Sequence, residues 1–465
     1  MNEKETQVRR PRLVIAGTQS GVGKTTLVTG LLAALRNQGK TVQSFKIGPD
    51  YIDPGFHALA SGRAAHNLDS WLVPQEKLPP LFVKAAAKAD ISIIEGVMGL
   101  YDGGRQGVSS TASLAKLLQA PVVLVLDVKS MGESAAAIAL GFRQYDPDVW
   151  FAGVILNRVG SASHERMVRE ALGRQNIPVL GCLHRDEALR LPERHLGLTP
   201  VTEQSLDEIV AAMGQSVGAA LDLEALCALA QEAPLLPAPA AAVSLPVPRA
   251  RLGVARDEAF SFYYPESMEV LARYGAELIP FSPLEDTALP EVDGLFFGGG
   301  FPEMFASQLA ANASMRQAVR RAAADGMPLY AECGGLMYLT ESLEDFSGQL
   351  YEMAQVVPAK CRMEKKLQTV GYVAATLEKD SLLGQGGACF QGHEFHFSSM
   401  EPLIEPFPWA FSFEKMRTGA VYPGGYASQN VLASYLHLHF AGNEEAAAAL
   451  VAACAAYAAR RSDRG

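Results

Sequence analysis

The chain has 465 residues, 49% of them hydrophobic and 19% charged, with 42 Gly and 27 Pro. This length exceeds the usual span of one domain and the apolar fraction suffices for substantial cores, so we expect two folded domains rather than a disordered or collagen-like chain. The formal net charge is −10, and an acidic chain without a basic block is poorly suited to hold a nucleic-acid backbone.

The cysteines and the N-terminus bear on the compartment. Six cysteines without a CxxC pair or regular spacing do not form a disulfide framework, which favours a reduced, cytoplasmic protein. The N-terminus is polar as far as Arg12, so we expect no signal region. Apolar runs such as 121–126 are too short to span a bilayer. We therefore expect neither nucleic acid nor membrane as a partner.

Short β-branched runs alternate with helix-length segments in the first half of the chain. Strands are predicted over residues 13–16, 42–47, 91–94, 122–126, 154–156 and 179–183, with helices at 24–38, 111–118 and 163–175. Near-continuous apolar strands separated by helices are typical of a parallel sheet covered on both faces. We therefore expect an α/β domain over residues 1–232.

A Pro/Ala-rich segment divides the chain. Residues 231–250 contain five prolines and cannot continue a helix or a central strand, so 233–250 is predicted to be a linker. A second α/β domain is expected over 251–465. Its predicted strands are 251–255, 277–281, 294–297 and 329–331, followed by a β-rich region at 350–440 and a helix at 445–460.

The first predicted strand runs into GTQSGVGKTT, residues 17–26, which is close to GxxxxGK[ST] with Thr18 at the first Gly position. Glycines allow backbone N–H groups to wrap a phosphate, and the start of the next helix adds partial positive charge. Lys24 would reach the β- and γ-phosphates and Thr25 would ligate Mg²⁺. The residues predicted to hold ATP in this loop are Thr18, Gly21, Val22, Gly23, Lys24, Thr25 and Thr26.

Carboxylates follow the second and third predicted strands: Asp50 and Asp53 in FKIGPDYIDPGFH, and Glu95 and Asp102 in IIEGVMGLYDG. The carboxyl edge of an open α/β sheet forms the ligand crevice, and carboxylates there can complete the oxygen shell of Mg²⁺ beside phosphates. For Asp50 and Glu95, which directly follow apolar strands, we favour this role. For Asp53, Tyr51 and Asp102, a ligand role and turn capping stay equally open.

These motifs resemble the dethiobiotin synthetase-like branch of P-loop enzymes, in which a GTxxGVGKT loop is paired with a strand-terminal Glu followed by Gly. The resemblance implies that ATP converts a carboxylate to an activated acyl species and that Thr25, Asp50 and Glu95 are linked to the metal. It also implies that Asn157, ending the strand GVILN, contacts adenine, although Asn at such a position is often only a helix cap.

The second half contains a candidate nucleophile. PLYAECGGLMYL, residues 328–339, places Cys333 between a strand and a helix, followed by Gly334. Such a turn exposes a nucleophile, and the helix start lowers the pKa of a thiol. The Gly334 N–H can hold an oxyanion, and LFFGGGFPE, residues 295–303, adds a second Gly-rich loop with Gly299 as donor. The other five cysteines are expected to be small buried apolar groups.

ASYLHLHF near the C-terminus offers His437 and His439 as the base for this thiol. Strand–Cys–Gly–Gly followed by Tyr-Leu-His resembles class I glutamine amidotransferases, which hydrolyse glutamine through a cysteinyl thioester and release ammonia. The resemblance places the base at His437. His439 stands where the family has a Glu that orients the imidazole, and it is the second candidate for the base. In GHEFH, residues 392–396, Glu394 is a candidate substitute for that Glu, or His393 and His396 are candidate substrate contacts, and no metal is expected there.

Seven motifs occur in one order across nearly the whole chain: GTQSGVGKTT, FKIGPDYIDP, EGVMGLYDG, ARDEAFSFYYPE, FFGGGFPE, AECGGLMYL and GHEFHFS. Together they resemble the cobyrinic acid a,c-diamide synthase family of cobalamin biosynthesis. The resemblance implies ATP- and L-glutamine-dependent amidation of a cobyrinic acid-type tetrapyrrole polycarboxylate, bound near Asp50, Tyr51, Asp53 and Asp102. It also allows a homodimer. Because this acceptor is acidic, local basic groups have to offset the net charge, and the candidates are His57, Arg63, Lys360, Arg362 and Lys365.

Other functions stay open at this point. Hydrogenobyrinic acid, which lacks cobalt, and nickel-sirohydrochlorin are substrates of closely similar enzymes, and cobyric acid synthase is the alternative enzyme. A different class is a deviant P-loop partitioning or regulatory protein with an inactive second domain. The surroundings of Cys333 argue against that class, because a binding module does not need an exposed strand-end Cys beside two Gly-rich loops.

Overall fold

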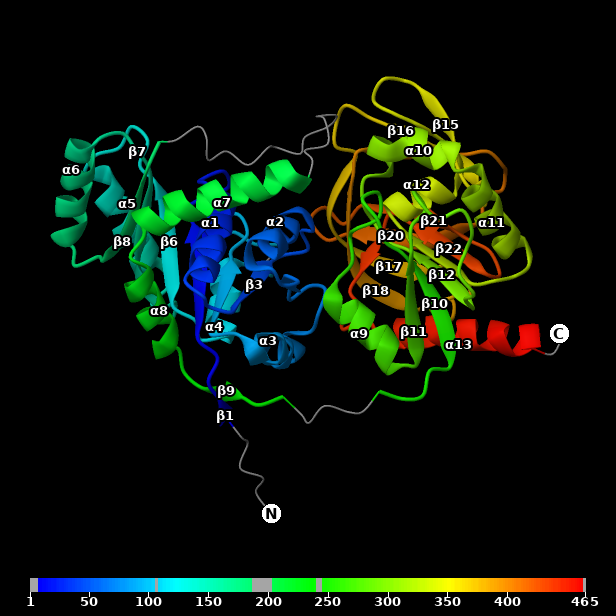
Figure 1. The fold of residues 1–465 in the computed structure, drawn as a ribbon, viewed down its shortest axis with the longest axis horizontal. Helices are drawn as coiled ribbons and strands as arrows, with labels where there is room; N and C mark the ends of the chain where they lie inside the picture. Colours follow the sequence, from blue (N-terminus) through cyan, green and yellow to red (C-terminus); the bar gives the residue numbers. More distant parts are fainter. Residues whose placement is uncertain (1–6, 105–107, 186–202, 240–244, 463–465) are drawn as a thin grey trace, which may run out of the picture. The chain divides into compact units, whose positions relative to one another are not determined.

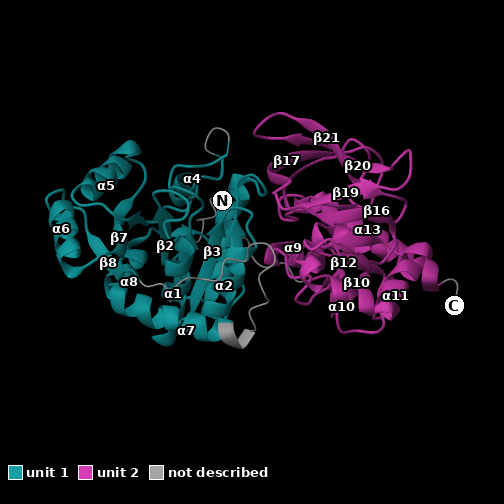
Figure 2. Cartoon of the chain, turned by 90° about the horizontal axis from the view of Figure 1, so that it is seen from above, with its two compact units in different colours: residues 1–193, 201–241 teal, residues 194–200, 242–465 magenta. Residues whose placement is uncertain are grey.

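The computed structural model describes residues 7–104, 108–185, 203–239 and 245–462, leaving aside the side chains of 203–205. The chain divides into two compact units (Figure 2): unit 1 comprises residues 1–193 and 201–241, and unit 2 comprises residues 194–200 and 242–465. Each unit has its own sheets and its own buried core. The predicted α/β fold class is confirmed.

Unit 1 is built on a seven-stranded parallel sheet of order β4-β3-β5-β2-β6-β7-β8 (Figure 1). Its strands are β2 (Arg12–Gly17), β3 (Val42–Ile47), β4 (His66–Leu68), β5 (Ile91–Glu95), β6 (Val122–Asp127), β7 (Phe151–Val159) and β8 (Val179–His184). Its helices are α1 (Lys24–Asn37), α2 (Ile52–Ser61), α3 (Leu78–Ala85), α4 (Thr111–Leu117), α5 (Ser134–Tyr145), α6 (Ala162–Gly173), α7 (Glu203–Ala220) and α8 (Leu223–Glu232). The six strand predictions for this half are confirmed, and the three-residue β4 is an addition to them.

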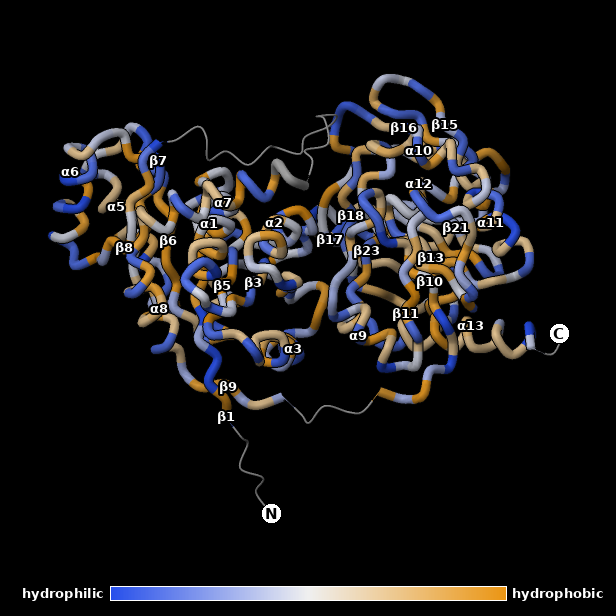
Figure 3. The backbone as a smooth tube through the Cα atoms, viewed as in Figure 1, coloured by the Kyte–Doolittle hydropathy of each residue, from blue (hydrophilic) through white to orange (hydrophobic). Residues whose placement is uncertain are grey.

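The core of unit 1 follows from the apolar strands. β2 and β5 are buried along their whole length, and Figure 3 shows the hydrophobic colour along β6 of the same sheet. Helix α1 packs so closely on α7 that a Cβ added to Gly30 would lie only 2.4 Å from Val217 Cγ2. The carboxyl ends of β2, β3 and β5 are adjacent at one edge of this sheet, which is where the phosphate loop and the acidic loops begin.

Part of the predicted linker packs on unit 1. β9 (Leu236–Pro237) pairs antiparallel with β1 (Gln7–Val8), whereas the first strand of unit 2 begins at Ala250. Residues 240–244 of the linker lie outside the described residues, as do residues 1–6 and 463–465 of the two predicted domains. The boundaries 1–232, 233–250 and 251–465 stay predictions.

Unit 2 contains a mixed ten-stranded sheet of order β11-β10-β12-β13-β22-β21-β20-β17-β18-β23. Its parallel half comprises β10 (Ala250–Ala255), β11 (Ala276–Phe281), β12 (Gly294–Phe297), β13 (Leu329–Glu332) and β22 (Val431–Ser434). Its antiparallel half comprises β17 (Thr369–Leu377), β18 (Cys389–His396), β20 (Trp409–Lys415), β21 (Val421–Ala427) and β23 (His437–Leu438). The strand predictions and the β-rich later region are confirmed.

A second, four-stranded sheet and five helices complete the described part of unit 2. The sheet contains β14 (Thr340–Glu344), β15 (Leu350–Glu352), β16 (Val357–Met363) and β19 (Ser398–Pro402). The helices are α9 (Pro265–Arg273), α10 (Ala306–Ala311), α11 (Ala313–Ala324), α12 (Gly334–Leu339) and α13 (Glu444–Ser462), with a 3₁₀ turn at Pro302–Phe305. Across the described residues, no helix is long and apolar enough to cross a membrane.

Candidate active sites

The phosphate loop links β2 to α1 in unit 1, as predicted. Gly21 (φ 77°) and Gly23 (φ 90°) have left-handed backbone conformations that glycine adopts readily. Asn157 of β7 donates from Nδ2 to the Val22 carbonyl at 2.7 Å, and the next residue, Arg158, donates to the Gly21 carbonyl at 3.0 Å. Asn157 therefore holds the loop in place, and its contact with adenine stays a prediction.

Lys24 points back onto its own loop and onto the loop after β5. Its Nζ donates to the Met98 carbonyl at 2.6 Å and to the Gln19 carbonyl at 3.3 Å. Burial, and then the charge of Lys46, lower the pKa of the Lys24 amine to about 8, although nearby carboxylates act in the opposite direction. A polyphosphate would replace two neutral acceptors with charged ones, which bind an ammonium more strongly.

A buried charge cluster lies beside the loop. The carboxylate of Glu95 is fully buried, and its Oε1 accepts from Thr25 Oγ1 at 2.8 Å and from Lys46 Nζ at 2.8 Å. Its Oε2 lies 2.7 Å from His57 Nε2, and Lys46 also pairs with Asp53 Oδ2 at 2.6 Å. Strand register produces the central pair, because Lys46 of β3 and Glu95 of β5 are direct neighbours across the ladder.

The carboxylates of this cluster differ in proton affinity. Burial would raise the pKa of Glu95, but the charges and hydrogen bonds of Lys46 and His57 hold it well below its usual range. Burial and the charge of Glu95 raise the pKa of Asp53 to about 7, although Lys46 acts in the opposite direction. Glu95 is thus ionised at neutral pH, and Asp53 changes protonation close to it.

These residues fit a Mg²⁺ ion that arrives with ATP. The Thr25 hydroxyl and the Glu95 carboxylate lie 2.8 Å apart and are oxygen donors of the kind that Mg²⁺ prefers. In the described part of the chain, no group of three or more His, Cys, Asp or Glu could hold a metal alone, so phosphates and waters would complete the shell. Asp50 accepts the backbone N–H of Ile52 at 2.9 Å and of Asp53 at 3.2 Å. It therefore caps the first turn of α2, and its metal role stays a prediction.

The other residues predicted to contact the acceptor substrate lie in loops or next to the start of a helix. Asp102 is exposed and accepts the Gly99 N–H at 3.0 Å, while Tyr51 immediately precedes α2. Their contact with an acceptor stays a prediction. Of the basic candidates, His57 is fully buried against Glu95, and Arg63 donates to Gln43 at 3.0 Å. His57 therefore stabilises Glu95 rather than facing an acceptor.

Cys333 lies at a strained turn between β13 and α12 in unit 2. Its φ of 46° and ψ of −102° are costly for a residue with a side chain, which confirms the predicted sharp turn. Its N–H donates to the Ser434 carbonyl at 2.7 Å, and its thiol is 3.9 Å from the Phe395 carbonyl.

Two expectations about Cys333 are wrong. The residue is buried rather than exposed, with 7% of its surface accessible. Its pKa is raised, not lowered: burial and then the charge of Glu303 outweigh the Gly334 N–H, which acts in the opposite direction. Helix α12 has only six residues, so its start does not compensate for this desolvation. The thiol therefore needs a base to become a nucleophile.

His437 lies beside Glu332, the residue that directly precedes Cys333. Its Nδ1 is 3.5 Å from Oε2 of Glu332, which directly precedes the thiol. A Cβ on Gly299 would be 2.6 Å from His437 Cε1, and a Cβ on Gly334 would be 3.1 Å from Gly300 N. The two predicted oxyanion residues thus lie close to the proposed nucleophile and base.

The alternatives for the base and its partner lie elsewhere in unit 2. His439 Nε2 is 3.7 Å from Glu266 Oε2, and its ring stacks on Tyr264 at 4.6 Å. Glu394 accepts a hydrogen bond from the Tyr422 hydroxyl and is 3.9 Å from His396 Nε2. The geometry therefore favours His437 over His439, and Glu332 over Glu394.

All six cysteines lie within the described residues and are free. Cys182, Cys361 and Cys454 are buried as expected and Cys227 is half-buried, whereas Cys389 at the start of β18 is exposed. For Cys389 the expectation of a buried apolar group is wrong, because its position on this strand faces outward.

Gly300, in the second Gly-rich loop, gives a stability prediction. A Cβ there would lie 2.0 Å from the Ala259 carbonyl oxygen, and its φ is 157°. We expect Gly300→Ala to lower the free energy of unfolding of unit 2 by about 3 kcal/mol, since the backbone must move. Urea unfolding followed by circular dichroism measures this. Gly141→Ala in α5, where a Cβ meets nothing within 4 Å, is the control and should not destabilise. An unchanged midpoint for Gly300→Ala would contradict the prediction.

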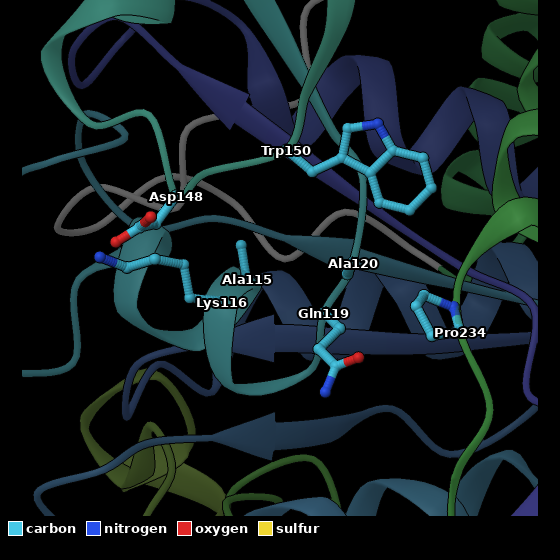
Figure 4. A pocket seen from close by; sticks show the side chains of 7 residues that line it. All are labelled: Ala115, Lys116, Gln119, Ala120, Asp148, Trp150 and Pro234. Carbon is cyan, nitrogen blue, oxygen red and sulfur yellow. The ribbon is translucent and has the colours of Figure 1, made fainter.

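A cavity of about 340 Å³ in unit 1 lies away from this chemistry (Figure 4). Its lining includes Gln119 and Ala120, which precede β6, and Trp150, which precedes β7. These positions are at the amino edge of the sheet, opposite to the edge that carries the phosphate loop. None of the predicted site residues lines this cavity.

Family models of known proteins match both halves of the chain. The "CobQ/CobB/MinD/ParA nucleotide binding domain" family matches residues 13–198, and the "CobB/CobQ-like glutamine amidotransferase domain" family matches residues 251–445. A solved glutamine amidotransferase matches 44% of this chain and 98% of its own length, at 18% identity and a TM-score of 0.32.

Curated relatives align over nearly the full length. Cobyrinate a,c-diamide synthase of Dehalococcoides mccartyi (strain CBDB1) is 44% identical, covering 94% of this chain and 96% of its own. The enzyme of that name from Leptospira interrogans (strain Fiocruz L1-130) is 40% identical, covering 96% and 99%. Hydrogenobyrinate a,c-diamide synthase of Streptomyces coelicolor is 43% identical, covering 96% and 97%. The chain therefore belongs to the cobyrinate a,c-diamide synthase family of glutamine amidotransferase ligases.

Proposed function

We propose that this chain amidates the a and c side-chain carboxylates of cobyrinic acid, or a close relative, using ATP and glutamine. The observation that carries the proposal is the presence in one chain of two sites: Lys24, Thr25 and Glu95 beside the phosphate loop, and Cys333 directly after Glu332, whose carboxylate is 3.5 Å from His437. The first pattern fits phosphoryl transfer and the second fits amide hydrolysis. The identity of the acceptor is inferred from the names of relatives that align over nearly the full length.

The proposed reaction has two halves. In unit 1 an acceptor carboxylate oxygen attacks the γ-phosphorus of ATP and ADP leaves, with Lys24 stabilising charge on the transferring group. Mg²⁺, which Thr25 and Glu95 would hold, supplies further positive charge. In unit 2 His437 takes the thiol proton, Cys333 attacks the glutamine amide and ammonia leaves, and water then releases glutamate from the thioester. Ammonia displaces phosphate from the acyl phosphate to form the amide.

The test is mass spectrometry of products formed with ATP, Mg²⁺, glutamine and separate tetrapyrrole acids. We expect cobyrinic acid to gain two amide groups, and NMR to locate them at the a and c side chains. Hydrogenobyrinic acid is the second candidate because the Streptomyces coelicolor relative is as similar as those named for cobyrinate. Nickel-sirohydrochlorin and the substrate of cobyric acid synthase complete the panel. No amidation of any acid, with the cofactors bound, would refute the proposal and favour a regulatory protein.

The Lys24 amine makes ATP binding depend on pH. With a pKa of about 8 in the nucleotide-free protein, the side chain is charged below pH 8 and loses its proton above it. The charged form binds polyphosphate better, so we expect the Kd for ATP with Mg²⁺ to rise up to tenfold between pH 8 and pH 9, and little below pH 7. Isothermal titration calorimetry at pH 7, 8 and 9 measures this. A flat Kd up to pH 9 would contradict the prediction.

A further inference from the structure

The base of the glutaminase site lacks the usual orienting residue. Two positions after His437, where class I amidotransferases have a Glu, this chain has His439. That imidazole lies 3.7 Å from Glu266 and stacks on Tyr264, and it has no carboxylate with which to orient His437. A base that must present one ring nitrogen to a thiol still needs a partner at the other nitrogen, to fix its tautomer and direction.

Glu332 lies at that other nitrogen. Its Oε2 is 3.5 Å from His437 Nδ1, and the side chains of both residues are at least 97% buried. Its Oε1 accepts from the Tyr330 hydroxyl at 2.7 Å and from the Leu438 N–H at 3.3 Å. The carboxylate is thus held by its own strand and also holds the backbone immediately after His437.

Neighbouring groups define the plane of the His437 ring. The His393 ring stacks on it at 4.9 Å, with 22° between the planes, and Gly299 packs against Cε1. β18 and β23 place the two histidines directly opposite each other across the ladder. With Nδ1 directed to Glu332, Nε2 is the nitrogen that can exchange a proton with Cys333.

We propose that Glu332, the residue directly before the nucleophile, orients His437 in place of the Glu that class I amidotransferases have two positions after the histidine. This rests on the proposed glutamine hydrolysis at Cys333. The Glu332 carboxylate accepts the Nδ1–H of His437 and stabilises the imidazolium formed when Nε2 takes the proton from Cys333 Sγ. Glu332 itself takes no proton, so it is a positioning residue. The 3.5 Å separation shortens when the ring becomes charged, as unliganded catalytic contacts commonly do.

The main test is Glu332→Gln in the full chain. Gln retains an acceptor for Tyr330 and Leu438 but presents N–H to Nδ1, which favours the tautomer with its proton on Nε2, the wrong one for a base. We expect kcat for glutamine hydrolysis to fall about 10³-fold with the KM for glutamine within about threefold. Ammonia-supported amidation should stay unchanged. Glu332→Asp, which keeps the charge, should recover part of kcat.

A double variant separates orientation from general damage. If Glu332 acts through His437, then Glu332→Gln added to His437→Asn should cost less than about threefold further. Glu266→Gln is the matched control, since it removes the buried carboxylate facing His439, and it should leave kcat within about threefold. The proposal would be overturned by full activity of Glu332→Gln, by a change in KM alone, by no recovery in Glu332→Asp, by additive losses in the double variant, or by a larger loss in Glu266→Gln. If the unaltered chain does not hydrolyse glutamine, the proposed function fails instead.

Discussion

Replacing Cys333 with Ser is expected to lower glutamine-supported amidation by about 10⁴-fold or more, while amidation from added ammonia continues. The hydroxyl is a far weaker nucleophile than a thiolate, and the site already disfavours the anion, because burial raises the pKa even of the thiol. Ammonia needs no thioester, so unit 1 can use it directly. The measurement is the rate of amide formation with glutamine, and separately with an ammonium salt, at saturating ATP and acceptor.

A cysteine of similar burial provides the control. Cys361 is buried in unit 2 and contacts the Tyr435 hydroxyl at 3.5 Å. Cys361→Ser should keep glutamine-supported amidation within a few-fold of the unaltered protein. Glutamine-supported amidation that survives Cys333→Ser would remove the thioester from the mechanism. Loss of amidation with both glutamine and ammonia would show that the substitution damages more than unit 2.

Local sequence patterns predicted most of the fold. Alternating apolar strands and helices gave the parallel sheet of unit 1, because buried strands in such sheets have apolar residues on both faces. β4 was missed because three residues, His66–Leu68, show no periodicity. The β9 pairing was also missed, since two residues of a Pro-rich segment carry no strand signal.

The sites were predicted less completely, because their key contacts join distant segments. Lys46 stands in a strand predicted correctly, but only the neighbouring register of β3 and β5 places it on Glu95. A lysine inside the apolar strand VQSFKI was the available signal. Glu332 directly precedes Cys333 in the sequence, yet nothing in the local pattern indicates its contact with His437, which lies about a hundred residues further along the chain. Burial of the thiol likewise results from packing that a turn motif does not specify.

Lys24→Ala is expected to lower the rate of amidation by about 10³-fold or more, with glutamine and with ammonia alike. Both routes need the acyl phosphate, and Lys24 is the loop ammonium that would stabilise charge on the transferring group. Glutamine hydrolysis without acceptor should continue, because Cys333 and His437 belong to unit 2. The two activities are measured in parallel as amide formation and glutamate release.

The control for this substitution is another lysine of unit 1. Lys116 in α4 forms an exposed ion pair with Asp146 at 2.6 Å, and such pairs contribute at most about 1 kcal/mol to stability. Lys116→Ala should therefore keep amidation near that of the unaltered chain, although it removes the same charge. If amidation is retained in Lys24→Ala, the residue does not act on the transferring phosphoryl group. Lys46, whose ammonium is bonded to Glu95 and Asp53, would then be the cation to test next at this site.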